Sequence, residues 1–298
     1  MNKEITETHN SNTSNLDKLS ISEIITIIND EDSNIPLLIK EIIPQVNLLI
    51  EKVVQHVKHG GRLIYVGSGT SGRLGVLDAS ECPPTFSTSP NIVIGLIAGG
   101  KKALYSSVEG AEDENNSADK DFEKVCIKSK DIVIGLSSSG STPYVHRILS
   151  RAKDKKAFTC LITSNYVNEE QYIDQIICIV VGPEIISGST RMKSGTAFKM
   201  ILNMISTITM IKLNKTYKNF MVDLNVSNKK LKRRALHMLI EITKLNKNEC
   251  ENLLLNAKGK VKIALVMHFK NCTYKEAIIN LKQYEGNLRK SIQPEKLN

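Results

Sequence analysis

Short apolar runs rich in β-branched residues recur through the middle of the chain, and each predicts a buried strand. Their apolarity is continuous rather than alternating, which is typical of strands covered on both faces of a parallel sheet. The runs are Leu63–Gly67, Ile92–Ala98, Asp131–Ser137, Phe158–Thr163 and Gln175–Val181. Helical stretches such as Thr142–Lys153 separate them. Strands that alternate with helices predict an α/β fold with a doubly wound, parallel, five-stranded sheet flanked by helices.

Helical periodicity dominates the chain on both sides of this region. The predicted helices are Ile21–Asn29, Pro36–His59 and Thr196–Lys212, followed by charged helices that break near Asn246 and Asn271. Pro44 predicts a kink or break in the second of these helices, because proline removes a backbone donor and crowds the preceding turn.

These elements predict four successive parts of the chain. Residues 1–20 are polar and rich in Asn, Thr and Ser, which predicts a loosely ordered N-terminal arm. Residues 21–60 form N-terminal helices that pack on an α/β domain of residues 61–225. Residues 226–298 form a small C-terminal helical domain.

Composition narrows the classes of partner. The 298 residues are 41% hydrophobic, enough for a large core, and carry a formal net charge of +9. Lysines are mixed with acids, aromatic residues are 5% and Trp is absent, so we expect no nucleic-acid partner. The densest basic cluster is Lys229, Lys230, Lys232, Arg233 and Arg234. A solvated helix face is the favoured interpretation of this cluster, and a part in holding an anionic ligand is the alternative.

Cysteine usage and hydropathy indicate a cytoplasmic protein. The six cysteines form no CxxC pair, and three of them lie in or beside apolar segments, which favours reduced, mostly buried thiols. The polar start of the chain is not a secretory signal, and no apolar run approaches the roughly 20 residues that span a bilayer. We therefore expect no membrane partner.

The first run is followed by a loop that predicts a phosphate cradle. In Gly67–Arg73, glycines let the backbone approach a ligand, and free N–H groups at the start of the next helix favour an anion. The candidate binding residues are Ser68, Gly69, Thr70 and Ser71. The letters GxGxxG also occur here, but no acidic residue closes the next strand, so dinucleotide binding is weakly indicated. A merely tight strand-to-helix turn is the alternative.

A second hydroxyl-rich loop follows the third run. Its candidate phosphosugar-binding residues are Ser138, Ser139, Gly140, Ser141 and Thr142, and Pro143 suits the first turn of a helix. Loops at the carboxyl ends of two parallel strands share one crevice. Neutral hydroxyls with a helix dipole suit a single phosphate group.

Two carboxylates near these loops are the candidates for acid–base chemistry. Glu81 has small neighbours and precedes two prolines, and a carboxyl group held near apolar surface acts as an acid because its pKa rises. Glu112 belongs to an acidic cluster in which Glu109, Glu112 and Asp113 are spaced to share one helical face. For each of these acidic residues, the alternative to a catalytic role is an exposed charged side chain on a helix surface.

A third loop, Gly182–Thr196, contains Arg191 and Lys193 and could bind an anion or close an interface. A solvated loop with two surface cations is the alternative. The six histidines form no metal-ligand set and no HExxH occurs, so we expect no metal site.

Longer runs resemble a known family. The two hydroxyl-rich loops resemble the SIS (sugar isomerase) phosphosugar-binding fold. The runs GRLIYVGSGTSGRLGVLDASECPPTF, VIGLIAGG, VEGAEDE, STPYV, GPEIISGSTRMKSGTA and FMVDLNVSN closely resemble the N-acetylmuramic acid 6-phosphate etherase family. The resemblance extends from Ile28–Asp32 nearly to the C-terminus, and GSTRMK is shared with the related glucokinase regulatory protein.

The resemblance implies a cytoplasmic carbon–oxygen lyase that needs no metal or cofactor and acts on a small phosphosugar. Members cleave the D-lactyl ether of N-acetylmuramic acid 6-phosphate with water, giving N-acetylglucosamine 6-phosphate and D-lactate in cell-wall recycling. The resemblance assigns the catalytic pair to Glu81 and Glu112, and we take Glu81 as the proton donor to lactate and Glu112 as the base. It also implies a homodimer whose active site is completed near the subunit interface.

One residue departs from the family pattern, and two other functions stay open. The second loop is usually closer to SGRTPY, whereas Ser141 here replaces the arginine, which weakens phosphate affinity or shifts the load to other groups. A sugar-phosphate sensor like the glucokinase regulatory protein would resemble a chain with two SIS units. An SIS-type aldose–ketose isomerase would not need the runs around Glu81 and Glu112. The presence of both runs favours the etherase.

Overall fold

The computed structural model describes residues 4–224, 226 and 228–293. Asn225 and Ser227 of the FMVDLNVSN run, and the outermost residues of the predicted arm and C-terminal domain, lie outside the described residues. The chain divides into two compact units, Met1–Glu81 with Pro90–Thr209, and Cys82–Ser89 with Met210–Asn298. The predicted domain boundary after residue 225 therefore falls within the second unit, and each unit is described by itself below.

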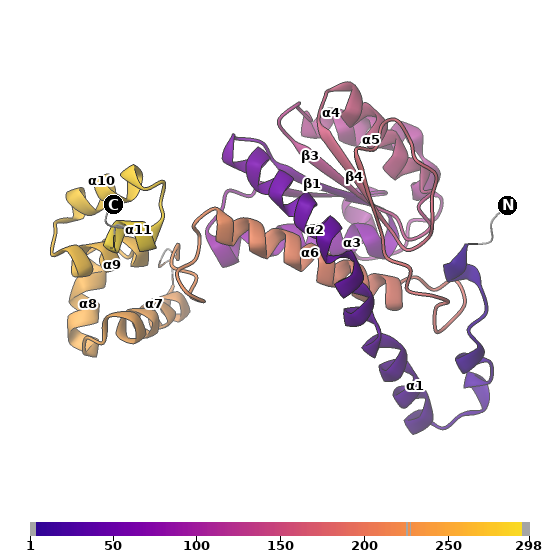
Figure 1. Ribbon diagram of the computed structural model, residues 1–298, viewed down its shortest axis with the longest axis horizontal. Helices are drawn as coiled ribbons and strands as arrows, with labels where there is room; N and C mark the ends of the chain where they lie inside the picture. Colours follow the sequence, from indigo (N-terminus) through magenta and orange to yellow (C-terminus); the bar gives the residue numbers. More distant parts are fainter. Residues whose placement is uncertain (1–3, 225, 227, 294–298) are drawn as a thin grey trace. The chain divides into compact units, whose positions relative to one another are not determined.

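The first unit is built on a five-stranded, all-parallel sheet with the strand order β2-β1-β3-β4-β5 (Figure 1). The strands are β1 (Leu63–Gly67), β2 (Val93–Ile97), β3 (Ile132–Leu136), β4 (Phe158–Thr163) and β5 (Gln175–Cys178). Each predicted run contains one strand, so the α/β prediction is confirmed. The sheet reverses its order between β1 and β3, where Gly67 pairs with Leu136 at the carboxyl ends. Crevices for ligands form at such reversals.

Helices cover both faces of this sheet. The helices that lie wholly or mostly in the first unit are α1 (Ile21–Ser33), α2 (Ile35–Lys58), α3 (Gly69–Phe86), α4 (Asn115–Val125), α5 (Pro143–Asp154) and α6 (Lys193–Lys212). Figure 1 shows α4 and α5 on one side of the sheet and α2, α3 and α6 on the other. Residues of β1 and β3 are all buried because both faces are covered. This is why their sequences are continuously apolar.

Two helices differ from their predictions. α1 continues to Ser33, beyond the predicted end at Asn29. α2 runs through Pro44 without a break. Pro44 and Lys40, whose carbonyl loses its partner at this proline, are both exposed, so water can satisfy the freed group.

The N-terminal arm is anchored rather than loosely ordered. Residues 5–18 form three short 3-10 turns, Ile5–Glu7, Ser11–Thr13 and Leu16–Lys18. Thr6 is fully buried, and the backbone N–H groups of Ile5 and Thr6 donate to Asn165 Oδ1 at 2.6 and 3.3 Å. The expectation of a loose arm is wrong because a polar segment can be held by a buried side chain that satisfies its backbone.

The second unit is helical and has its own core. Its helices are α7 (Lys229–Thr243), α8 (Lys247–Asn256), α9 (Val261–Lys270), α10 (Tyr274–Gln283) and α11 (Leu288–Ile292). Leu239, Cys250 and Ala264 are among the fully buried residues at its centre. The predicted breaks occur where expected: Asn246 caps the start of α8, and Asn271 ends α9 in the left-handed region at φ +47°. A further break around Gly259 was not predicted.

Two general expectations can be compared with the described residues. No helix within residues 4–293, apart from the undescribed positions 225 and 227, is long and apolar enough to cross a bilayer. None of the six cysteines, all of which the structure describes, takes part in a disulfide. Three cysteines are buried, two are half-buried and Cys126 is exposed.

Candidate functional site

The two hydroxyl-rich loops converge on one cavity of about 240 Å³ at the carboxyl ends of β1 and β3. The cavity is lined by Glu4, Thr6, Glu7, Ser68, Gly69, Thr70, Ser71, Glu112, Leu136, Ser137, Ser138, Ser139, Thr142, Gly188 and Thr190. Seven of the nine predicted phosphosugar-binding residues are in this set. Because β1 and β3 are neighbours in the sheet, the loops that follow them lie side by side.

Close backbone packing shapes the first loop. A Cβ atom on Gly67 would lie 2.6 Å from the amide nitrogen of Gly72, so no larger residue fits there. The Gly72 N–H donates to the Ser68 carbonyl at 3.0 Å and closes the turn. α3 then starts at Gly69, and the first N–H groups of a helix have no intrahelical acceptor. They are available to an anion in the cavity.

Ser137 organises the second loop. Its Oγ accepts a hydrogen bond from the Gly140 N–H at 3.0 Å and bonds to Thr142 Oγ1 at 2.7 Å. Gly140 has φ +80°, and a Cβ atom there would lie 2.2 Å from Val167 Cγ1, so this position requires glycine. Ser137 was not among the predicted binding residues, although its place at the end of the apolar run was the available signal.

Glu112 lies at the edge of the first loop. Ser68 Oγ donates to Glu112 Oε2 at 3.4 Å. Glu112 belongs to a 3-10 turn, Ala111–Asp113, and α4 starts only at Asn115. The predicted helical face shared by Glu109, Glu112 and Asp113 is therefore wrong. The turn, preceded by Gly110 at φ +72°, carries Glu112 to the cavity and leaves its neighbours outside the lining.

Glu81 is not brought to this cavity. It is exposed on α3, 12 residues after Gly69. At a rise of about 1.5 Å per residue, Glu81 lies about 18 Å along the helix from the cradle. Within one chain, the structure therefore separates the two predicted catalytic carboxylates.

The N-terminal arm forms one wall of the cavity, which was not predicted from the sequence. Glu4, Thr6 and Glu7 line the cavity together with the two loops, and the Gly188 N–H donates to the Thr6 carbonyl at 3.2 Å. Burial and the charge of Glu7 raise the pKa of Glu4. No lysine or arginine is among the described residues that line the cavity.

Similar proteins can now be set beside this geometry. The chain is 44% identical to the N-acetylmuramic acid 6-phosphate etherase of Staphylococcus epidermidis over 98% of this chain and 99% of that protein. It is also 44% identical to the etherase of Actinobacillus pleuropneumoniae serotype 5b, over 98% of this chain and 96% of that protein. The chain belongs to the N-acetylmuramic acid 6-phosphate etherase family.

Other comparisons relate this etherase-family chain to SIS proteins. Residues 45–153 match the glucokinase regulatory protein N-terminal SIS domain, and residues 218–262 match the C-terminal lid domain of glucokinase regulatory protein. Among solved structures, the sugar isomerase domain of an RpiR transcription factor from Sphaerobacter thermophilus is similar with a TM-score of 0.42 and 13% identity, over 74% of this chain and 98% of that one. A phosphoheptose isomerase from Francisella tularensis is similar with a TM-score of 0.42 and 13% identity, over 66% of this chain and 100% of that one.

The departure of this etherase-family chain from the SGRTPY pattern lies beside the cavity. Ser141 Oγ donates to Ser139 Oγ at 3.0 Å, and Ser141 is exposed. Ser141 and Gly140 line a neighbouring cavity of about 550 Å³ rather than the cradle itself. Ser139 lines both cavities. It therefore links position 141, where the family pattern has an arginine, to the cavity between the two hydroxyl-rich loops.

Lys193 of the third predicted loop forms an ion pair with α1 in this etherase-family chain. Lys193 is 5% exposed, and its Nζ pairs with Glu31 Oε2 at 2.5 Å. Burial of Glu31 acts to raise its pKa, but hydrogen bonds from Lys193 and Asn12 and the charge of Lys193 lower it overall. Lys193 does not line the cavity, and neither does the exposed Arg191. Within the described part of the chain, no group of three His, Cys, Asp or Glu side chains could hold a metal ion.

Proposed function

We propose that this chain cleaves the D-lactyl ether of N-acetylmuramic acid 6-phosphate with water, giving N-acetylglucosamine 6-phosphate and D-lactate. The observation that carries the proposal is the cavity at the β1–β3 reversal, where two hydroxyl-rich loops and Glu112 meet. Full-length relatives at 44% identity bear the name of this etherase.

The cavity would hold the phosphate group through neutral donors. Backbone N–H groups at the start of α3 favour an anion, and hydroxyls of Ser68, Thr70 and Ser71 add donors. On the opposite side, Ser138, Ser139 and Thr142 supply further hydroxyls, while Gly140 sets the conformation of their loop. The carboxylates of Glu4, Glu7 and Glu112 line the same cavity and would repel an anion. The phosphate group is therefore assigned to the end of the cavity nearest the start of α3.

Elimination followed by hydration explains the use of carboxylates. Ring opening of the sugar gives an aldehyde at C1, which acidifies the proton on C2. A base removes this proton, the C3–O bond breaks, and an acid gives a proton to the departing lactate oxygen. Water then adds its hydroxyl to C3 and a proton to C2. Two carboxyl groups whose pKa values differ can carry out these transfers.

We assign the base to Glu112 because it lies at the edge of the phosphate loop, 3.4 Å from Ser68 Oγ. Six covalent bonds separate phosphorus from the lactyl ether oxygen, which at about 1.5 Å each is less than about 9 Å. Glu81 of the same chain, about 18 Å along α3 from the cradle, is out of reach. We therefore propose a homodimer in which the partner subunit's Glu81 supplies the acid.

The first experiment measures D-lactate released from N-acetylmuramic acid 6-phosphate in a buffer that contains a chelator. The wild-type chain should release lactate, and Glu112→Gln should lose about 100-fold or more in turnover, the size of one acid–base contribution. Asp113→Asn is the matched control, since Asp113 neighbours Glu112 but does not line the cavity. Tight phosphosugar binding without lactate release would contradict the etherase and favour a sensor.

A mixed dimer tests where the acid comes from. A dimer purified through two different tags would carry Glu81→Ala in one subunit and Glu112→Ala in the other. If the partner completes each site, one of the two sites stays intact, and turnover should be roughly half that of the wild type. An inactive mixed dimer, with both single variants inactive, would place the whole site in one chain. Full activity of Glu81→Ala would instead make Glu4 the next candidate acid.

We also propose a cytoplasmic location. The substrate is a phosphorylated sugar, which does not cross membranes unaided, and a chain with six unpaired cysteines suits a reducing compartment. Fluorescence microscopy of the full chain fused to a fluorescent reporter would test this location.

A further inference from the structure

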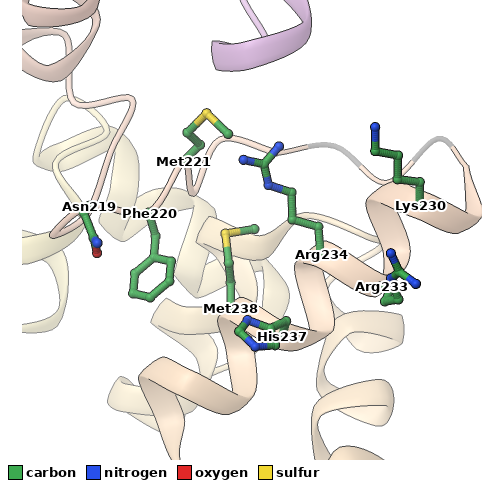
Figure 2. A pocket seen from close by; sticks show the side chains of 8 residues that line it. All are labelled: Asn219, Phe220, Met221, Lys230, Arg233, Arg234, His237 and Met238. Carbon is green, nitrogen blue, oxygen red and sulfur yellow. The ribbon is translucent and has the colours of Figure 1, made fainter.

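A cationic cavity in the second unit is lined by none of the residues to which the proposed reaction is assigned. Its volume is about 540 Å³, and Figure 2 shows its side chains. It is lined by Asn219, Phe220, Met221, Lys230, Arg233, Arg234, His237 and Met238. These residues come from α7 and from the short segment 219–221, both of which belong to the second unit.

The basic side chains share one face of α7. Lys230, Arg233, Arg234 and His237 are spaced i, i+3, i+4 and i+7, so they lie next to one another along the helix. The like charges of Lys230, Arg233 and Arg234 repel one another, and Lys230 in the first turn opposes the helix dipole. Among the described residues, none of these four side chains forms an ion pair with a carboxylate. The arrangement therefore leaves positive charge that an anion would stabilise.

Three apolar side chains line the same cavity as these basic side chains. Met238 is 4% exposed, and Phe220 and Met221 are half-buried. The segment that carries Phe220 is held by a pair of backbone hydrogen bonds of 2.9 Å between Tyr217 and Phe220. Figure 2 shows Arg234 and Met238 on α7, and Phe220 and Met221 on the segment beside it. A ligand that fits both features has an anionic group and a small carbon body.

The size and chemistry favour a small molecule over a polymer. Pockets for small ligands range over about 300–1,000 Å³, and 540 Å³ falls in this range. Guanidinium groups bind carboxylate and phosphate oxygens through paired donors. A single phenylalanine is not a platform on which successive nucleic-acid bases could stack.

We propose that this cavity binds a small organic anion, a carboxylate or a phosphate monoester, with Arg233 and Arg234 on the anionic group and Phe220 and Met221 against its carbon body. The proposal does not depend on the etherase reaction. The same chemistry can come from a hydroxy acid such as D-lactate or from a sugar phosphate such as N-acetylglucosamine 6-phosphate, and separate titrations distinguish these two sources.

Histidine NMR on the full chain tests the proposal, because His237 lines this cavity and His146 reports on the cradle loop through its 2.7 Å contact with the Gly140 carbonyl. The His237 ring signal, assigned with His237→Gln, is followed while D-lactate, N-acetylglucosamine 6-phosphate or inorganic phosphate is added. At least one organic anion should move the His237 signal saturably, and inorganic phosphate, which has no carbon body, should bind more weakly. The anion that saturates at lower concentration identifies the source.

Two variants distinguish binding in this cavity from nonspecific attraction of anions to the positive charge of α7. Arg234→Gln should weaken the binding seen at His237 by about tenfold or more, the effect of losing one charge-assisted contact. Lys232→Gln removes the same charge from the same helix but does not line the cavity, so it should change binding less than about twofold. Equal weakening by both variants, or movement of the His146 signal alone, would overturn the proposal. Lactate release is measured independently, so failure here leaves the etherase proposal standing.

Discussion

Replacing Asn165 with alanine should release the N-terminal arm from the cradle while the sheet stays folded. Asn165 Oδ1 accepts hydrogen bonds from the N–H groups of Ile5 and Thr6, and its Nδ2 donates to Thr6 Oγ1 at 2.9 Å and to the Ser138 carbonyl at 2.8 Å. One buried side chain thus holds both the arm and the second hydroxyl-rich loop.

The magnitude follows from the three bonds that reach the arm. Each hydrogen bond contributes about 0.5–1.5 kcal/mol net, so the arm should lose about 1.5–4.5 kcal/mol of docking free energy. This corresponds to roughly a 10- to 1,500-fold rise in the opening of the arm. Glu4, Thr6 and Glu7 line the cavity, so phosphosugar turnover should fall with the docked population.

Amide hydrogen exchange is the direct assay. Exchange at Ile5 and Thr6 should accelerate in Asn165→Ala, whereas exchange in β4 should change little because that strand opens only with the whole unit. Thr6→Val is the matched control, since it removes only the bond from Asn165 Nδ2 to Thr6 Oγ1, and its effect should be intermediate. The reasoning is refuted if arm exchange in Asn165→Ala equals that of the wild type, or if β4 accelerates equally.

Three further predictions concern the fold and the cradle. Glu31→Gln should lower the free energy of unfolding by about 3 kcal/mol at pH 7, because buried Lys193 loses its ion-pair partner. Since the folded pKa of Glu31 is lowered, this difference should be full above its ordinary pKa of 4.5 and shrink as pH falls through the folded value, as urea unfolding at pH 7, 5 and 4 would measure. Asp78→Ala should cost about 2–4 kcal/mol by the same method, because Asp78 accepts hydrogen bonds from Asn203 and Ser206 of α6. Ser137→Ala should raise KM for the phosphosugar about tenfold and lower the melting temperature by a few degrees, and an unchanged KM would show that this hydroxyl does not order the loop.

The five strands and both hydroxyl-rich loops could be predicted because their signals are local. Continuous apolar runs reflect burial on both faces, and each run contains one strand of the sheet. Seven of nine predicted binding residues line one cavity because loops after neighbouring parallel strands meet at the same edge. Asn246 and Asn271 likewise mark helix ends through their own side chains and backbone conformation.

The distance between the two predicted catalytic carboxylates could not be predicted from such local signals. Glu81 and Glu112 both follow the first loop in sequence, yet α3 carries Glu81 away from the cradle while a 3-10 turn brings Glu112 back to it. The anchoring of the arm is equally non-local, since Asn165 follows Thr6 by 159 residues. The cationic cavity combines a basic spacing that can be read from the sequence of α7 with apolar side chains from α7 itself (Met238) and from another segment (Phe220 and Met221).

The sequence by itself determined the α/β fold, the two hydroxyl-rich loops and the etherase family, because periodicity, glycine sterics and long motif runs act over a few residues. Only the tertiary structure decided which carboxylates share a cavity, that Lys193 pairs with Glu31 and that the arm forms a wall of the cradle. These contacts depend on the direction of each helix and on packing between residues far apart in the chain, which no local pattern encodes.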